Sequence, residues 1–317
     1  MSLLAAKVRS GLVETEHEGA VAVVAPDGSL LAHVGDIDRP FFLRSAAKPF
    51  QAAVAQSLGA DLTLLELALA AASHDGLPVH VALVRSILTR SGLDEHDLGC
   101  PSAWPISGDE TRRLARAGHF HPRPIWHNCS GKHASWLRAS QLRGWPTSNY
   151  LGPEHPLQTE IIDFVTTLGG MSARPVGIDG CGAPVMRTTT RVMAGLFAAL
   201  GNEPSLREVF TAMHRYPALT SGPENGDSRL AVASNVVAKR GAEGCLGVAT
   251  RDGPGVAVKS WDGSEAVAGV AMASVLAEIA VGSSYMSDRL SSFTRAPVHG
   301  GGVEVGALET RLELLWE

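Results

Sequence analysis

The sequence predicts an α+β fold: an antiparallel sheet built from both chain ends, with flanking helices and a helical subdomain beside it. Apolar, strand-like runs with turn signals occur at both ends of the chain, and helical patterns dominate between them. No internal repeat or low-complexity linker interrupts the 317 residues. We therefore expect a single domain over 1–317, whose sheet subdomain spans roughly 1–45 and 240–317 and whose helical subdomain spans roughly 46–239.

The individual elements follow from local signals. A first hairpin is predicted at 19–25 and 29–34, because Pro26-Asp27-Gly28 separates two apolar runs. Ser107 and Glu110 form a capping box that opens one helix. The other helices of the middle segment are predicted at 62–72, 78–89, 133–142, 155–168, 191–200, 205–214 and 228–239. Strands return at 246–250 and 256–261, and a helix at 265–280 and a strand at 303–314 complete the pattern.

Composition excludes several function classes. Net charge is −5 and the pI about 6.2, without a basic cluster, so we expect no nucleic-acid partner. The longest apolar tract, 265–281, contains Glu278 and is Ala/Gly-rich, which predicts a buried helix and no membrane span. Residues 1–17 do not resemble a secretory signal. The four cysteines are then expected to be reduced thiols, and the protein to be cytoplasmic.

The passage most indicative of chemistry is a Ser-x-x-Lys quartet, Ser45 to Lys48, which runs into a helical pattern. One helical turn separates the two side chains, so a partly desolvated lysine could remove the proton of the serine hydroxyl. Backbone N–H groups at a helix start could hold an oxyanion. With 27 serines and five lysines, about 0.4 such quartets would arise by chance, so a serine N-cap followed by a solvated lysine is an equal alternative.

Two further passages carry candidate catalytic groups. Ser73-His74-Asp75 suggests a triad, but three consecutive side chains cannot all face one another, and a helix end stopped by Gly76 explains the passage as well. Lys259 lies on a late, mostly apolar strand, like the Lys-Thr-Gly strand of acyl-transfer enzymes that use Ser-x-x-Lys. An edge-strand lysine that prevents aggregation is the alternative.

Two glycine-bearing loops are each centred on a cysteine, Cys129 and Cys181. Glycine allows a ligand to approach the backbone closely. Two thiolates with a nitrogen donor could bind a zinc-like ion, but no C-x-x-C spacing supports this. From spacing alone, two buried free thiols are the favoured interpretation.

Together these motifs resemble the asparaginase II family, the Rhizobium-type L-asparaginases, over nearly the whole chain. The motifs are Arg44-Ser45-x-x-Lys48-Pro49, Ser73-His74, the loop 128–133, the loop 177–182, and Lys259. The resemblance implies a serine β-lactamase-like fold, similar to that of glutaminases. It also implies two Ser–Lys tandems, Ser45 with Lys48 and Ser73 with Lys259, and a zinc ion held by Cys129, Cys181 and Lys132.

The activity implied is that of an L-asparagine amidohydrolase, in which Ser45 forms an acyl-enzyme and Lys48 is its base. Ser73 and Lys259 would relay a proton to the departing ammonia. Arg44, Asp179 and His133 are the candidates for holding the substrate. The zinc would not be needed for the chemical step, and we expect a homodimer. The alternatives are a glutaminase or β-lactamase-like hydrolase on the same scaffold, or a non-catalytic protein that binds an amino acid or a metal.

Overall fold

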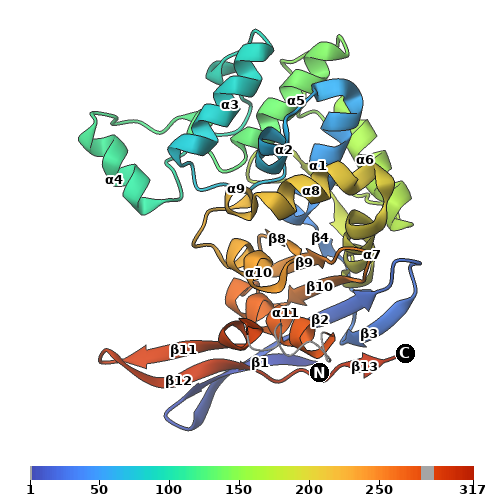
Figure 1. Ribbon diagram of the computed structural model, residues 1–317, viewed down its shortest axis with the longest axis vertical. Helices are drawn as coiled ribbons and strands as arrows, with labels where there is room; N and C mark the ends of the chain where they lie inside the picture. Colours follow the sequence, from blue (N-terminus) through green and yellow to red (C-terminus); the bar gives the residue numbers. More distant parts are fainter. Residues whose placement is uncertain (1, 280–288) are drawn as a thin grey trace. The chain divides into compact units, whose positions relative to one another are not determined.

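The computed structural model describes residues 2–279 and 289–317, which group into two units (Figure 1). The first, here the sheet unit, comprises Met1–Ala46, Thr188–Glu203 and Arg229–Glu317. The second, here the helical unit, comprises Ala47–Arg187 and Pro204–Ser228. Two segments of the predicted helical stretch, 188–203 and 229–239, thus group with the sheet.

An antiparallel sheet of nine strands forms the core of the sheet unit and confirms the predicted α+β class. Its main path runs in the order β11-β12-β1-β2-β10-β9-β8, while β3 pairs with β2 and with β13, so that both chain ends contribute (Figure 1). The strands are β1 (Leu3–Arg9), β2 (Leu12–Val24), β3 (Leu30–Val34), β8 (Val237–Gly241), β9 (Cys245–Ala249), β10 (Gly255–Ser260), β11 (Arg295–Gly300), β12 (Val303–Thr310) and β13 (Leu315–Trp316).

Helices α7 (Thr190–Asn202) and α11 (Glu265–Ile279) cover opposite faces of this sheet. Gly255 faces α7 so closely that a Cβ there would lie 2.1 Å from the backbone nitrogen of Ala198. The neighbouring Val256 and Val258 instead pack in the apolar cluster that includes α11. Since side chains alternate along a strand, the two helices must lie on different faces. Ala280, the predicted end of α11, lies outside the described residues.

The sequence predictions for this unit were incomplete or wrong in several places. Strand β2 begins at Leu12, and neither its first half nor β1 was predicted, because exposed charged residues interrupt the apolar pattern. Strand β11 was also missed. The predicted helix 228–239 is wrong at its end: α10 (Gly226–Ser234) stops before Asn235, whose φ of 56° is left-handed, and β8 follows.

The helical unit is organised around α2 and α5, which contact each other and several neighbours. Nearly every side chain of α5 is buried, Trp136 completely. The helix begins at Ser130, three residues earlier than predicted, so Lys132 and His133 lie in its first turn. The helices are α1 (Lys48–Ala55), α2 (Leu64–Ala70), α3 (Pro78–Arg90), α4 (Gly108–Arg116), α5 (Ser130–Leu142), α6 (Pro156–Gly169), α8 (Arg207–Arg215) and α9 (Pro217–Thr220).

Short elements complete the chain. Half of the predicted capping box of α4 is present, since Ser107 Oγ accepts a hydrogen bond of 3.2 Å from Glu110 N. The other half is not, because Ser107 N donates to Asp75 O and the Glu110 carboxylate accepts from Arg113. The short strands are β4 (Phe41–Phe42), β5 (Gly177–Ile178), β6 (Pro184–Val185) and β7 (Arg187–Thr188). The short helical turns are η1 (Arg44–Ala47), η2 (Gln56–Ala60), η3 (Glu95–Asp97), η4 (Pro124–Trp126), η5 (Pro204–Leu206) and η6 (Ser291–Phe293).

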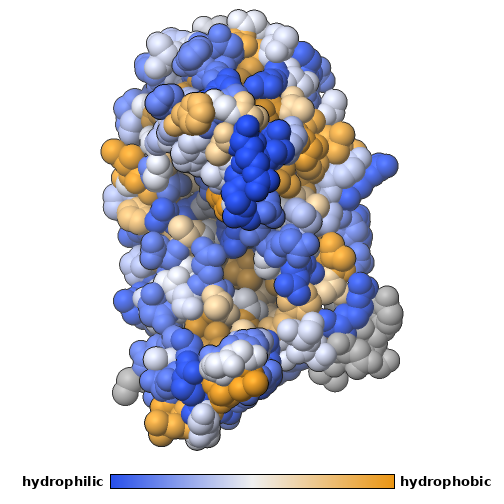
Figure 2. All heavy atoms as spheres, turned by 90° about the vertical axis from the view of Figure 1, so that its left-hand side faces the viewer, coloured by the Kyte–Doolittle hydropathy of each residue, from blue (hydrophilic) through white to orange (hydrophobic). Residues whose placement is uncertain are grey.

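The surface mixes polar and apolar residues. Figure 2 shows polar side chains over much of one face, with apolar patches between them. In the sheet unit, Leu12 and Val303 at the ends of their hairpins are 71% and 63% exposed. Within the described ranges, no helix combines the length and the apolar character needed to cross a membrane.

Candidate functional site

A buried lysine–serine pair is the central feature of the helical unit. Lys48, the first residue of α1, is only 1% exposed, and its Nζ donates hydrogen bonds to Ser73 Oγ at 2.9 Å and to Ala72 O at 2.5 Å. Ser73 lies in the loop after α2, where its own N–H donates to Thr220 O at 2.8 Å. The end of α2 and the start of α1 therefore bring an amine and a hydroxyl into direct contact.

The environment of Lys48 favours its use as a proton acceptor. Burial lowers the pKa of its ammonium below the usual 10.5, and Lys132 adds to this, although the thiols of Cys129 and Cys181 act in the opposite direction. A lysine with a lowered pKa is more often neutral near pH 7, and only the neutral amine can take a proton from a hydroxyl.

Cys129, Lys132 and Cys181 form a buried cluster next to this pair. Lys132 Nζ lies 3.2 Å from Cys181 Sγ. The pKa of the Cys129 thiol lies well below its ordinary value, mainly because of a hydrogen bond with Cys181. Burial acts to raise this pKa, whereas the charges of Lys48 and Lys132 lower it further. Burial lowers the pKa of Lys132, but the two thiols outweigh it and raise that pKa overall. The Cys129 thiol therefore loses its proton more readily than a free cysteine, and Lys132 holds its proton more firmly than a free lysine.

The donors of this cluster, two sulfurs and one nitrogen, are of the types that bind zinc. Three protein ligands are also the number found in catalytic zinc sites. Among the described residues, no three His, Cys, Asp or Glu side chains converge in a way that could hold a metal. The third protein ligand would thus have to be Lys132, which must lose its proton first.

Two of the predicted substrate-binding residues lie near this cluster. His133 is fully buried, and burial lowers the pKa of its imidazole to about 4, partly offset by Cys181. Asp179 begins the tight turn that carries Cys181: its N–H donates to Ala183 O, and its carbonyl accepts from Gly182 N, both at 2.8 Å. Gly182 has a φ of 83°, which favours glycine there.

The remaining predicted residues, Arg44, Ser45 and Lys259, belong to the sheet unit. Lys259 Nζ donates to Glu243 O at 2.6 Å and to Ser260 O, and it lies 5.3 Å from the centre of the Trp261 ring. Burial lowers the pKa of Lys259, against the effect of Cys245. Arg44 has a left-handed φ of 50°, a strained conformation for a non-glycine residue immediately before Ser45.

The resemblance implied two Ser–Lys tandems, Ser45 with Lys48 and Ser73 with Lys259, and these pairings stay predictions. Within the helical unit, the serine that Lys48 contacts is Ser73. The boundary between the units falls between Ala46 and Ala47, so Ser45 and Lys48 lie on either side of it.

The literal triad Ser73-His74-Asp75 does not form. His74 Nε2 instead lies 3.0 Å from Ser130 Oγ, and Asp75 Oδ1 accepts a hydrogen bond of 2.9 Å from Asn225. The three side chains thus point to three different partners. Gly76, with a φ of 74°, turns the chain after them. The simpler interpretation of a helix stopped by Gly76 is also wrong, because α2 already ends at Ala70.

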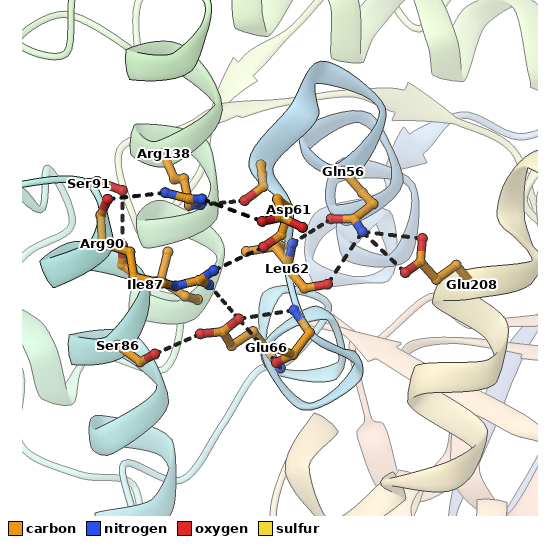
Figure 3. Close-up of polar contacts among 12 residues, drawn as sticks. Gln56, Asp61, Leu62, Glu66, Ser86, Ile87, Arg90, Ser91, Arg138 and Glu208 are labelled. Carbon is orange, nitrogen blue, oxygen red and sulfur yellow. Dashed lines mark hydrogen bonds and ion pairs between the residues drawn. The ribbon is translucent and has the colours of Figure 1, made fainter.

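A polar network joins the ends of α1, α2, α3 and α5 that lie away from Lys48 and Ser73 (Figure 3). Glu66 accepts from Arg90 at 2.6 Å and from Ser86 at 2.9 Å. Arg138 donates to Ala60 O and, at 3.3 Å, to Arg90 O. Because α1, α2 and α5 carry or precede Lys48, Ser73 and Lys132, this network helps to fix their relative positions.

We expect Glu66→Gln to lower the free energy of unfolding by about 2 kcal/mol, since it removes a buried charge that accepts several hydrogen bonds. Burial raises the pKa of Glu66, but hydrogen bonds from Thr63 and Ser86 and the charge of Arg90 outweigh it, so the folded pKa lies below 4.5. The carboxylate therefore stabilises the fold above pH 4.5, and this contribution is lost as the pH falls through the folded pKa.

Urea unfolding at several pH values measures this effect. The difference between wild type and Glu66→Gln should shrink as the pH falls below 4.5. The matched control is Glu208→Gln, which changes an exposed carboxylate of the same network and should cost less than about 0.5 kcal/mol (Figure 3). Equal losses for both variants would contradict the role assigned to Glu66.

Sequence reasoning missed Tyr150, whose hydroxyl lies 2.6 Å from His133 Nδ1. It also missed His127, whose Nδ1 accepts a hydrogen bond of 3.0 Å from Cys129 N. His127 lies two residues before Cys129, so the sequence alone could have identified it as a candidate residue of the site. The tyrosine lies 17 residues from His133 and carries no local motif, so only the fold brings it to the site.

Comparison with known proteins gives an extended match to a family model. A family model for L-asparaginase II matches residues 5–310. No curated protein matches the chain.

Solved structures give weaker likenesses. The native form of Mglu is 16% identical at a TM-score of 0.42, over 79% of this chain and 61% of that one. The glutamate form of Mglu is 16% identical at a TM-score of 0.44, over 79% and 58%. A Bacillus glutaminase in 4.3 M NaCl is 16% identical at 0.38, over 83% and 91%. The chain thus spans less than two thirds of the length of Mglu.

Proposed function

Because this chain belongs to the L-asparaginase II family, we propose that it is an amidohydrolase that converts L-asparagine and water to L-aspartate and ammonia. The observation in the structure that carries the proposal is the buried contact between Lys48 Nζ and Ser73 Oγ. It couples an amine whose pKa is lowered to a serine hydroxyl, which is the pairing that proton transfer in acyl transfer requires.

The reaction proceeds through a serine ester. Neutral Lys48 takes the proton of Ser45, and Ser45 Oγ attacks the side-chain amide carbon of asparagine. Backbone N–H groups at the turn η1 and the start of α1 stabilise the resulting oxyanion. The C–N bond then breaks as a proton reaches the nitrogen, and ammonia leaves. Water, deprotonated in turn, attacks the ester and releases aspartate and the free serine.

Ser73 carries the proton between Lys48 and the leaving group, a role supported by its direct hydrogen bond with Lys48. Lys259 assists from β10 in the sheet unit, where burial lowers its pKa. Arg44 and Asp179 are the charged groups we propose to hold the α-carboxylate and the α-ammonium of the substrate, with His133 as a third contact. Complementary charges at these positions favour a small zwitterionic substrate.

Release of ammonia by the purified protein tests this proposal. We expect turnover of asparagine and much slower turnover of glutamine and of a chromogenic β-lactam. Faster release from glutamine would assign the chain to glutamine hydrolysis, and lactam opening to a β-lactamase-like reaction. No turnover of any of the three would favour a binding protein and contradict the proposal.

We further propose that Cys129, Cys181 and Lys132 hold a zinc ion, which would act as a Lewis acid that orients a substrate oxygen. If the ion serves binding and not the chemical step, a chelator should raise KM several-fold and leave kcat nearly unchanged. Zinc titration should also show weaker binding as the pH falls, because the ligands must lose protons.

The control for the zinc proposal is Cys100→Ser. Burial raises the pKa of the Cys100 thiol to about 12, so it stays protonated and should not ligate zinc. Cys129→Ser should abolish high-affinity zinc binding, whereas Cys100→Ser should preserve it. Equal zinc affinity in both variants would rule out the proposed ligand set.

A homodimer is proposed as well, with the exposed apolar residues Leu12 and Val303 as candidate contacts. Light scattering of the wild type and of Leu12→Asp tests it: we expect a dimer for the former and a monomer for the latter.

A further inference from the structure

Tyr150 stands between a backbone amide and a histidine of the candidate site. The residue is 2% exposed and His133 is fully buried. Gly99 N donates a hydrogen bond of 2.7 Å to Tyr150 Oη, and the same oxygen lies 2.6 Å from His133 Nδ1. All three residues belong to the helical unit.

The position of the protons follows from counting donors and acceptors. Burial raises the pKa of the Tyr150 phenol, so the group keeps its single proton. The amide of Gly99 is itself a donor and occupies a lone pair of the phenol oxygen. The O–H of Tyr150 must therefore donate to His133 Nδ1, which has to present a lone pair. The ring proton of neutral His133 then lies on Nε2.

The opposite tautomer is disfavoured. With a proton on Nδ1, two N–H donors would face Tyr150 Oη and its own O–H would lose its acceptor. A buried donor without an acceptor costs about 1–3 kcal/mol, enough to make one tautomer dominate.

The Nε2–H group of His133, on the other side of the ring, is available as a hydrogen-bond donor. His133 Nε2 is buried, and no oxygen or nitrogen of the described residues accepts a hydrogen bond from it; the side-chain acceptor that acts on the ring is the sulfur of Cys181. Cys181 and Lys132 both act on the charge of the imidazole, which places the ring beside the cysteine cluster. An Nε2–H group can donate to an oxygen but has no lone pair for a metal, so His133 is not a ligand of the proposed zinc.

We propose that Tyr150 is a positioning residue that fixes His133 as the Nε2–H tautomer, so that Nε2–H donates to a carboxylate or amide oxygen of the substrate. The role of the substrate oxygen rests on the proposed amidohydrolase function, whereas the tautomer follows from the hydrogen bonds alone. Tyr150 thereby acts on substrate binding without touching the substrate.

Nitrogen NMR of protein labelled with 15N-histidine tests the tautomer directly. The wild type should show a protonated Nε2 and an unprotonated Nδ1 for His133, identified by the signal that His133→Asn removes. A protonated Nδ1 in the wild type would overturn the inference, and this measurement needs no variant of Tyr150.

Steady-state kinetics test the consequence. Tyr150→Phe should raise KM for asparagine about five- to tenfold, with kcat within about twofold, since one hydrogen bond that orients the binding group is lost. It should also make the His133 nitrogen signals a mixture of tautomers. Tyr216→Phe, a matched change in the same unit, should alter neither KM nor the His133 signals.

A folded Tyr150→Phe protein with unchanged KM and an unchanged His133 spectrum would overturn the inference, and thermal unfolding shows whether the variant is folded. If the wild type hydrolysed no amide, the proposed function would fail, and the NMR measurement would still decide the tautomer. The two failures are therefore distinguishable.

Discussion

Replacing Lys48 by arginine should lower kcat for asparagine at least about a hundredfold, nearly as much as replacement by alanine. Arginine preserves the positive charge but cannot release its proton at any ordinary pH, so it cannot act as the base. The site of Lys48 is also confined: the side chain is 1% exposed and donates to Ala72 O and Ser73 Oγ.

The pH dependence gives a second measurement of the same role. Since burial lowers the pKa of Lys48 below 10.5, kcat/KM should rise with pH through that lowered pKa as the neutral amine forms. The control is Lys7→Arg on β1, a lysine outside the proposed site, which should keep full activity. A Lys48→Arg protein with most of its activity would show that the role of Lys48 is electrostatic and that another group is the base.

The sheet could be predicted only where the apolar pattern was strong. The runs that became β9 and β10 are short, apolar and bounded by turn residues, and both were located within one residue at each end. Strand β1 pairs with the first half of β2. That half of β2 carries exposed Glu and Thr residues, so it shows no apolar pattern. Their strand conformation depends on pairing with distant partners such as β12, which a local pattern does not reveal.

The contacts in the candidate site also depend on residues that are distant in the sequence, which local patterns do not reveal. The cysteine loops were visible in the sequence, and spacing alone favoured two buried free thiols. Both thiols are buried and free in the structure, but the fold also brings Lys132 within 3.2 Å of Cys181 across 49 residues, which spacing did not predict. The partner of Lys48 also depends on the fold: Ser73 is 25 residues away and meets Lys48 because α2 ends beside the start of α1. Sequence spacing predicted Ser45 as the partner of Lys48 because it can indicate only contacts between residues within one helical turn.

Ser45→Ala should reduce turnover to less than about a hundredth of the wild-type rate, since loss of a nucleophile removes the covalent route altogether. Arg44, the first residue of the turn η1, has a left-handed φ of 50°, and strained backbone of this kind clusters at functional sites, which supports Ser45 as the attacking residue. Ser73→Ala should also be impaired, because Lys48 loses a hydrogen-bond partner, but it should still form the ester.

The position of the ester separates the two serines. Acid quenching during turnover, followed by peptide mass spectrometry, should find the added aspartyl group on the peptide that contains Ser45, in the wild type and in Ser73→Ala. Ser57→Ala is a suitable control, because Ser57 Oγ donates to Val54 O in the turn after α1 and the residue lies outside the proposed chemistry. An aspartyl group on Ser73 would make the observed Lys48–Ser73 pair the nucleophile and base, and Ser45 would then serve the oxyanion or the substrate instead.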